Sequence, residues 1–175
     1  MKILLSLILI WLFLSISAFA QVKSVYTSLA AKDCKTIESN DQEGGSYRGE
    51  CPGAGGYRLE LLEGDIRQTI NIIAPDKTRF ELDLWSKVSS GFSAVGEKAE
   101  WRVRSGRPSA LIIRFNVNEK ADAEDPAALV SYLVIAKITG NSACLTDVVG
   151  PVKNQNVKAR QLADQSAGKP CYKTR

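Results

Sequence analysis

The segments SALIIRFNV at residues 109–117 and SYLVIAKIT at residues 131–139 give the strongest indication of the fold. Both are short, and both are apolar at most positions rather than at every second one. A strand with this pattern is covered on both faces, because successive side chains of a strand point to opposite sides of the sheet. We therefore predict that the two segments are central strands and form the spine of the core.

The segments around this spine alternate apolar and polar residues, as strands with one buried and one wet face do. The clearest alternation predicts a buried face with Ile66, Gln68, Ile70 and Ile72, opposite a wet face with Arg67, Thr69 and Asn71. Residues 58–73 then form a hairpin around Glu63, Gly64 and Asp65, in which Gly64 can take a positive φ. Further strands are expected to contain Phe80, Leu82 and Leu84, then Trp101 and Val103, and finally residues 142–149.

The tail alone has a clearly helical period. After Pro151, small apolar residues recur at helix spacing, Asn154 or Asn156 can cap the start, and Gly168-Lys169-Pro170 can end the helix. We predict a terminal helix over residues 154–168. The expected fold class is mainly β, an antiparallel barrel or sandwich of about seven to nine strands with a C-terminal α-helix. The pattern leaves barrel and sandwich open.

Residues 1–20, MKILLSLILIWLFLSISAFA, have a lysine near the start, an apolar centre and a small-x-small end. This predicts a signal peptide cleaved before Gln21, so that residues 21–175 form a single β domain stabilised by disulfides. An uncleaved anchor is the alternative, since the apolar run borders on spanning length. No later segment is apolar enough to cross a membrane. We expect export to the periplasm or the extracellular space.

After cleavage, 22 basic residues face 19 acidic ones, a mild excess. Nucleic-acid-binding domains are usually more basic, so no nucleic acid is expected as a partner. An unknown envelope protein or an anionic envelope polymer remains as the expected partner.

The chain has four cysteines, Cys34, Cys51, Cys144 and Cys171. An even number in an exported domain predicts two disulfides, for which three pairings exist. We prefer Cys34 with Cys51 and Cys144 with Cys171, because each pair closes a short loop. A four-cysteine zinc site is the alternative, although the chain has no CxxC pair.

Histidine is absent from the entire sequence. It is the usual general base near neutral pH, the partner of a nucleophilic Ser or Cys, and the commonest transition-metal ligand. Triad hydrolases and zinc peptidases are therefore disfavoured, and we predict no cofactor and no metal.

The loop ECPGAGGY, residues 50–57, contains three glycines directly after a cysteine. A phosphate-binding loop would place its glycines between a strand and a helix and would carry a lysine or the GxGxxG spacing. This loop leads into the predicted strand YRLELL instead. We predict that it turns the chain rather than holding a ligand.

The stretch WRVRSGRPSALIIR carries four arginines, Arg102, Arg104, Arg107 and Arg114. If residues 105–108 turn as a hairpin, Arg102 and Arg104 share one strand face, and Arg114 can reach the same surface. Arginine offers a planar fork of donors that suits a carboxylate or a phosphate of a partner. The alternative is a solvated face paired with Glu81 and Asp83 on another strand.

Three further candidates are weaker. Glycoside hydrolysis needs only two carboxylates, for which Glu81 with Asp83 or Glu60 with Glu63 are available. The acidic connection over residues 118–125 has oxygen ligands for calcium but lacks the spacing of an EF-hand, and Asp125-Pro126 could start one helical turn. The aromatic residues of the segment 85–101, Trp85, Phe92 and Trp101, are expected to plug the core at one end of the sheet. The alternative is that this segment binds a small molecule or a partner, as loops at the end of a β-sheet often do.

The succession CKTIE, CPGAGGYRL, DIRQTI, GEKAEWR, ALIIRFN and YLVIAKIT, followed by a late cysteine, resembles a family of small exported bacterial proteins with no assigned activity. This resemblance spans most of residues 21–175 and implies a place in the bacterial envelope. A looser similarity is to periplasmic lysozyme inhibitors, which are also small, exported, disulfide-bearing β domains. It rests on GGSYRG, residues 44–49, where Ser46 and Tyr47 stand in a glycine-flanked turn.

From these observations we expect a non-enzymatic binding domain of the bacterial envelope. One alternative is an inhibitor of an extracellular hydrolase such as lysozyme, in which Ser46, Tyr47 and the arginine face would occupy an acidic cleft. A second alternative is a glycoside hydrolase that works through carboxylates alone.

Overall fold

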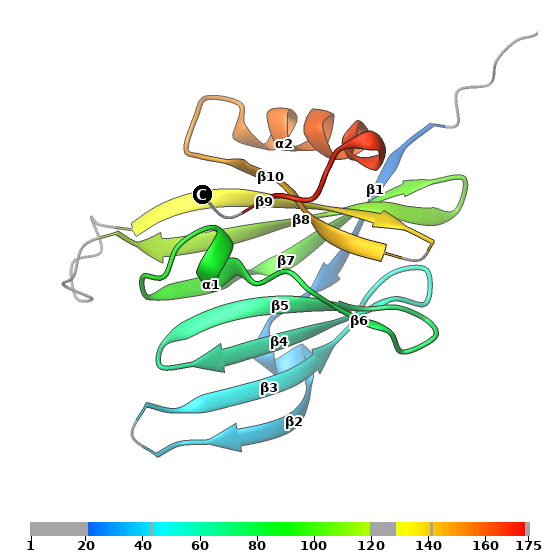
Figure 1. Ribbon diagram of the computed structural model, residues 1–175. Coiled ribbons are helices and arrows are strands. Elements are labelled where there is room, and N and C mark those ends of the chain that lie inside the picture. The colour runs from blue at the N-terminus through cyan, green and yellow to red at the C-terminus, as the bar shows by residue number, and fades with distance from the viewer. Residues whose placement is uncertain (1–20, 43, 120–128, 141, 174–175) are drawn as a thin grey trace, which may run out of the picture.

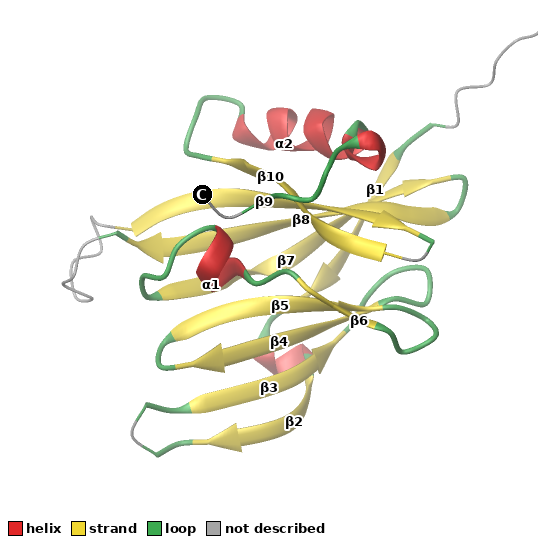
Figure 2. Cartoon of the chain, in the orientation of Figure 1, coloured by secondary structure: helices red, strands yellow, loops and turns green. Residues whose placement is uncertain are grey.

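A computed structural model describes residues 21–42, 44–119, 129–140 and 142–173. This part of the chain is mainly β, with ten strands and two α-helices (Figures 1 and 2). The strands are β1 Lys23–Ser28, β2 Lys35–Asn40, β3 Ser46–Cys51, β4 Arg58–Gly64, β5 Arg67–Ile73, β6 Arg79–Glu81, β7 Ser93–Arg104, β8 Arg107–Asn118, β9 Leu129–Thr139 and β10 Ser142–Val149. The helices are α1 Leu84–Lys87 and α2 Gln155–Asp164. The strand count exceeds the expected seven to nine. The predicted leader and the predicted turn at Asp125-Pro126 lie outside the described residues.

The strands form one sheet of two antiparallel halves. The helix-side layer has the order β1-β7-β8-β9-β10, and the hairpin layer has the order β6-β5-β4-β3-β2. A single parallel bridge between Arg67 and Ser93 joins them. The sheet curls so that β6 approaches β10, yet no pairing between these two strands closes it in the described chain. The fold is therefore sandwich-like rather than a closed barrel.

The predicted spine is confirmed, because β8 and β9 are buried on both faces. One face contributes Leu111, Ile113, Phe115, Val134 and Ala136 to the main core between the two layers. The opposite face contributes Ala110, Ile112, Leu133 and Ile135 to a smaller cluster under α2, which lies across this layer in Figure 1. Continuous apolar sequence thus corresponds to a strand between two packed surfaces.

The hairpin β4–β5 is confirmed, but its turn is not where the glycine suggested. Gly64 ends β4 and pairs with Arg67, while Asp65 and Ile66 take the two positive φ values, 50° and 57°. A two-residue hairpin turn of this kind needs both central residues in the left-handed region. Ile66 is therefore exposed at the turn and does not belong to the buried face.

Two further expectations around β5 are wrong. Leu84 does not continue the strand β6 but begins α1, and its backbone N–H donates to Thr69 Oγ1 at 3.2 Å. The supposedly wet residues Thr69 and Asn71 are buried. Asn71 donates to the carboxylate of Glu60, so hydrogen bonds satisfy the face that we expected to meet water.

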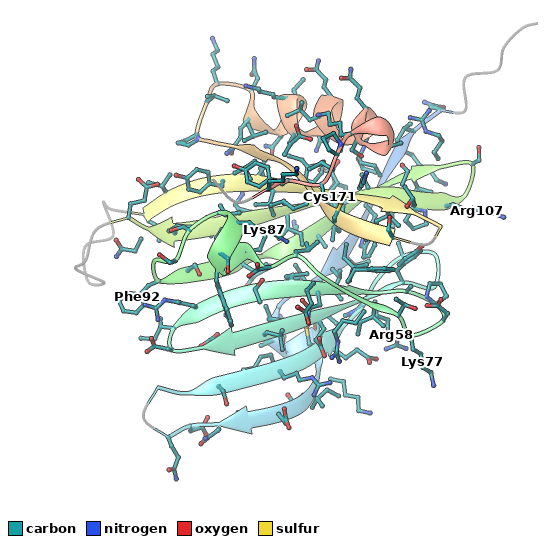
Figure 3. All side chains as sticks on the ribbon, in the orientation of Figure 1. Arg58, Lys77, Lys87, Phe92, Arg107 and Cys171 are labelled. Atoms are coloured by element: carbon teal, nitrogen blue, oxygen red, sulfur yellow. A yellow bond between two sulfur atoms is a disulfide. The ribbon has the colours of Figure 1, made fainter. Side chains whose placement is uncertain are left out.

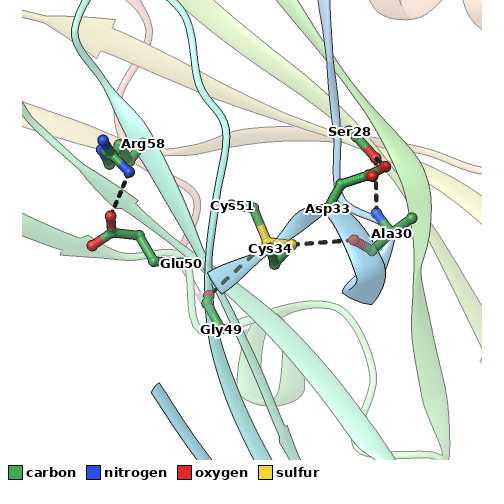
Figure 4. The surroundings of a disulfide bond; sticks show 8 residues. All are labelled: Ser28, Ala30, Asp33, Cys34, Gly49, Glu50, Cys51 and Arg58. Atoms are coloured by element: carbon green, nitrogen blue, oxygen red, sulfur yellow. Dashed lines mark hydrogen bonds and ion pairs between the residues drawn. A yellow bond between two sulfur atoms is a disulfide. The ribbon is translucent and has the colours of Figure 1, made fainter. Parts of the chain in front are cut away.

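Both preferred disulfides are present, Cys34–Cys51 and Cys144–Cys171, with Cα–Cα distances of 4.1 and 5.7 Å. All four cysteines are used, so the zinc alternative is wrong. Figure 4 shows the first bond between β3 and the segment that leads into β2. Two disulfides indicate an oxidising, non-cytoplasmic environment.

The loop after Cys51 turns the chain, as predicted. Gly55 and Gly56 have φ values of 60° and 84°, and the N–H of Tyr57 donates to the Ala54 carbonyl at 3.0 Å. The loop then enters β4 rather than a helix. Its backbone therefore lacks the helix N-terminus that a phosphate-binding loop uses.

The tail contains a helix followed by a separate 3-10 turn, Ser166–Gly168, rather than one helix over residues 154–168. Asn154 occupies the N-cap position, but its side chain makes no capping hydrogen bond. Ala159 and Ala163 are the buried residues of α2, and the bond Cys144–Cys171 ties the following segment to β10. No helix in the described residues is long and apolar enough to span a membrane.

Candidate functional site

The arginine stretch folds as the expected hairpin. Arg104 pairs with Arg107 across a turn at Ser105 and Gly106, and Arg102 and Arg114 stand on the sheet face toward α2. Arg107 is exposed at the end of this hairpin (Figure 3). The structure therefore brings Arg102, Arg104 and Arg114 to one surface. α2 buries Arg102 there and partly covers Arg114, whereas Arg104 is exposed.

Arg102 holds the C-terminal end of α2. Its Nε and Nη2 donate to the two carboxylate oxygens of Asp164, both at 2.7 Å, and only 8% of the residue is exposed. The hydrogen bond to Asp164 raises the pKa of Arg102 above its ordinary value, against the effect of burial. Arg104 adds a hydrogen bond from Nη2 to the Asp164 carbonyl at 3.1 Å. These two arginines therefore serve the fold.

A second ion pair runs in the opposite direction, from α2 to β7. Arg160 Nε and Nη2 donate to the carboxylate of Glu100 at 2.6 and 3.1 Å, and Ser24 Oγ donates to the same carboxylate at 2.5 Å. Burial would raise the pKa of Glu100, but the hydrogen bonds from Arg160 and Ser24 outweigh it and lower this pKa. Nη2 of Arg160 also donates to the hydroxyl of Tyr26 at 3.0 Å.

The partners of the arginine face thus differ from the expected ones. Glu81 lies on β6 in the other layer and is exposed, so the pairing with Glu81 and Asp83 is wrong. The true partners are Asp164 and Glu100. A signal for them existed, because Arg160 and Asp164 stand four residues apart on the predicted helix, and Glu100 stands two residues before Arg102 on one strand face.

Arg114 has no carboxylate partner among the described residues. Its Nη1 donates to Ser131 Oγ at 2.7 Å and to Gln155 Oε1 at 3.1 Å, and its Nη2 approaches Asn156 Oδ1 at 3.3 Å. All three acceptors are neutral. Arg102 and Arg160, the other two arginines between α2 and the sheet, each pair with a carboxylate, so Arg114 is the one of these three whose charge the described chain leaves unbalanced.

Arg114 lines a groove of about 420 Å³ between α2, β1 and a bulge of β7. The bulge interrupts the pairing of β7 with β8 between Val95 and Ala99. Gly96 faces Arg114 there, and a Cβ at this position would lie 2.9 Å from the Cβ of Arg114. The lining residues are Tyr26, Gly96, Glu97, Lys98, Glu100, Ile112, Arg114, Leu133, Asn156 and Arg160. This size falls in the range of small-ligand sites.

The groove continues along the edge strand. A second hollow shares Tyr26, Glu97 and Lys98 with the first and extends beside β1 toward Ala30 and Lys32. Tyr26 is 54% exposed between the two hollows. An extended ligand can therefore contact both hollows across one aromatic ring.

Ser46 and Tyr47 do not join the arginine face, because they lie on β3 in the hairpin layer. Ser46 is exposed, whereas Tyr47 is half-buried and packs against the main core. The Tyr47 hydroxyl is buried and has no hydrogen-bond partner in the described part of the chain. Its ring lies over Gly49, where a Cβ would meet the hydroxyl at 2.2 Å. Tyr47 therefore does not project into solvent, where it could insert into the cleft of a partner enzyme.

The carboxylate pairs lend no support to acid–base chemistry. Glu60 is 3% exposed, which the sequence did not indicate, and it accepts hydrogen bonds from Arg48, Arg79 and Asn71. Burial would raise the pKa of Glu60, yet the hydrogen bonds from Asn71 and Arg48 lower it. A general acid of a glycoside hydrolase needs a raised pKa. Glu63 accepts a hydrogen bond from Gln68.

The predicted aromatic plugs are of two kinds. Trp101 is fully buried in the main core, as expected, and Tyr57 lies beside it at a ring distance of 6.3 Å. Trp85, within α1, and Phe92, just before β7, are half-buried. Trp85 Nε1 donates to the Gln68 carbonyl, and the Arg67 guanidinium lies 4.8 Å from the centre of the Phe92 ring.

Over the described residues, no group of three or more Cys, Asp or Glu side chains is placed to hold a metal ion. Most of the acidic connection that we considered for calcium, residues 120–128, lies outside them. Comparisons with known proteins give no match: no family model, no curated protein and no solved structure. The geometry of the groove and the chemistry of its residues therefore carry the functional argument.

Proposed function

We propose that this protein is a non-enzymatic binding domain of the bacterial envelope and that it binds an anionic envelope component in the groove under α2. The observation that carries the proposal is the groove itself. It is lined by Lys98, Arg114 and Arg160, against the acids Glu97 and Glu100. Arg160 and Glu100 neutralise each other. Lys98 and Arg114 then face only Glu97, so one net positive charge remains for a ligand.

The groove is also held in shape before a ligand arrives. Its α2 wall is fixed at one end by Arg102 and Asp164, in the middle by Arg160 and Glu100, and beyond the helix by the disulfide to Cys171. A preformed site loses less conformational entropy on binding than one that must be ordered. This rigidity supports a binding role.

The resemblance to small exported envelope proteins and the leader-like residues 1–20 support the location. Two disulfides fit the same compartment, since they persist in the periplasm and outside the cell. The partner class follows from the charge of the groove, because many envelope polymers are anionic.

The proposal is tested with residues 21–175, disulfides formed, and a soluble anionic envelope polysaccharide at about 50 and about 150 mM salt, a range over which exposed charge pairs are progressively screened. Asn156→Trp fills the groove from an exposed position of α2, and Lys158→Trp adds the same ring outside it. We expect wild type and Lys158→Trp to bind at both salts and Asn156→Trp to lose binding at least about tenfold. Binding only at low salt, or equal binding by both variants, would contradict the proposal.

Inhibition of an extracellular hydrolase such as lysozyme stays the alternative, with less support, because Tyr47 packs against the main core and Ser46 lies on β3 in the hairpin layer, not on the arginine surface. A zymogram on peptidoglycan separates the three functions. Clearing by the protein alone would indicate a hydrolase, protection against added lysozyme would indicate an inhibitor, and neither effect is expected of a pure binding domain.

A further inference from the structure

We infer that Arg114 is the anchor of the groove and that it binds a carboxylate group of the ligand through its Nε–Nη2 edge; this inference rests on the proposed function. Three arginines lie between α2 and the sheet, Arg102, Arg160 and Arg114, and the first two use this same edge for a carboxylate.

The two occupied edges define the geometry. Arg102 presents Nε and Nη2 to Asp164 at 2.7 and 2.7 Å, and Arg160 presents Nε and Nη2 to Glu100 at 2.6 and 3.1 Å. Both are bidentate pairs, in which two parallel N–H donors face the two oxygens of a planar carboxylate. Two arginines under α2 therefore already bind a carboxylate of the chain through their Nε–Nη2 edges.

Arg114 differs from Arg102 and Arg160 in what fills this edge. Its Nη1 is satisfied by Ser131 and Gln155, which fix the orientation of the guanidinium. Among the described residues its Nε–H has no acceptor, and Nη2 meets only Asn156 at 3.3 Å. The edge that holds Asp164 and Glu100 elsewhere is thus free of a carboxylate here, on a side chain that lines the groove.

The surroundings indicate what carries the carboxylate. Ile112 and Leu133 form an apolar floor, and Tyr26 offers an exposed ring at the opening. Two acids line the groove: Glu100 is engaged by Arg160 and Ser24, and Glu97 is exposed and forms no ion pair with Arg114 in the described chain. Neither acid therefore occupies Arg114. The site therefore fits a small organic acid with one carboxylate and a compact ring or short chain, such as an acidic sugar or the carboxylate end of a short peptide.

The inference is tested with ¹⁵N-labelled protein, residues 21–175, by following the arginine Nε–H resonances. The probes are glucuronate, N-acetylalanine and neutral glucose, each at constant ionic strength. Arg114→Lys keeps the charge but removes the fork, and it identifies the Arg114 resonance by its disappearance. Arg104→Lys is the matched control, because Arg104 is exposed and contacts only the Asp164 carbonyl among the described residues.

We expect glucuronate, N-acetylalanine or both to shift the Arg114 Nε–H resonance while glucose leaves it unchanged and the Arg102 and Arg160 resonances stay in place. A response to glucuronate alone assigns an acidic sugar, and a response to N-acetylalanine alone assigns a peptide carboxylate. Arg114→Lys should weaken binding at least about tenfold, whereas Arg104→Lys should bind like wild type.

An Arg114 resonance that no carboxylate shifts would overturn the inference, as would equal binding by Arg114→Lys and wild type. The envelope-polymer assay on the same variants tests the proposed binding function separately from the role of Arg114. Polymer bound equally by wild type and Arg114→Lys would leave the binding domain standing and reject the role of Arg114. Polymer bound by neither protein, with the carboxylate shift intact, would reject the envelope partner and keep the anchor.

Discussion

The two faces of the helix-side layer are held in different ways. The inner face packs Leu111, Ile113 and Phe115 against the hairpin layer in one large apolar core. The outer face meets α2, whose buried residues are the small Ala159 and Ala163, with Leu162 partly buried beside them. On the outer face, two ion pairs and a disulfide add to the small apolar contact and fix α2 on the sheet. The difference shows how a helix with a weak apolar face can be fixed on a sheet and still leave a polar groove beneath it.

The inner face should be the more sensitive to loss of volume. Phe115 is fully buried, so Phe115→Ala removes a large side chain from the main core and leaves a cavity. We expect the free energy of unfolding to fall by about 4 kcal/mol, measured by urea denaturation. Leu129→Ala at an exposed position of β9 is the control and should change little. A loss below about 1 kcal/mol for Phe115→Ala would reject the inner face as the main core.

The outer face should be the more sensitive to loss of charge pairing. Arg102→Met leaves Asp164 without its bidentate partner, and we expect a loss of about 3 kcal/mol, with faster hydrogen exchange in α2. The double variant Arg102→Met/Asp164→Leu should recover much of this loss, because no charge is left unpaired. If the double variant is no more stable than the single one, the pair does not hold α2 in the way described.

The disulfides should differ in reactivity as the faces differ in packing. Cys171 is exposed, whereas Cys34 and Cys51 are 9% and 0% exposed. A mild reductant should therefore open Cys144–Cys171 first, detected by alkylation and mass spectrometry. Replacing Cys144 and Cys171 by serine should lower the free energy of unfolding by about 2–3 kcal/mol. Reduction of Cys34–Cys51 first would contradict the burial pattern.

Acidification should produce the smallest effect and should act on both layers. The pKa values of Glu100 and Glu60 lie below their ordinary value of 4.5 in the folded protein, despite burial, because of their hydrogen bonds. The unfolded chain therefore takes up these protons first as pH falls. The stability that the two groups supply is complete above about pH 4.5 and is lost as pH falls through the lower folded values.

The measurement is the urea midpoint from pH 7 to pH 3. Glu100→Gln should show a shallower decrease below pH 4.5 than wild type, and the exposed Glu81→Gln should follow the wild-type curve. An unchanged slope in Glu100→Gln would show that the Arg160 and Ser24 contacts do not control this pKa.

Local pattern predicted the parts of the fold that depend on neighbours in sequence. The apolar runs predicted β8 and β9, the short loops predicted both disulfides, and the small-residue period predicted α2. The turn at Asp65 and Ile66 was misplaced because a nearby glycine is an easier signal than two strained non-glycine residues. β1 carries no strong alternation and pairs with β7 about 75 positions later, a distance that local pattern does not bridge.

The sequence predicted which arginines lie at the candidate site, but not which of them pair with carboxylates of the chain itself. Arg102, Arg104 and Arg114 were correctly placed on one face, yet the sequence did not show that α2 buries Arg102 and partly covers Arg114. Which arginine pairs inside the chain depends on where Asp164 and Glu100 arrive in space, and these residues lie on different elements. The groove depends in addition on the bulge around Gly96, which no local motif announces.

We have proposed that Arg102 and Arg160 serve the fold and that Arg114 serves a ligand. Crystal structures of residues 21–175 grown with glucuronate and, separately, with N-acetylalanine would test this. We predict Asp164 on Arg102 and Glu100 on Arg160 in both crystals, and the carboxylate of at least one of the two compounds on Nε and Nη2 of Arg114. A carboxylate of the chain itself on Arg114, or an empty groove in both crystals, would contradict the proposal.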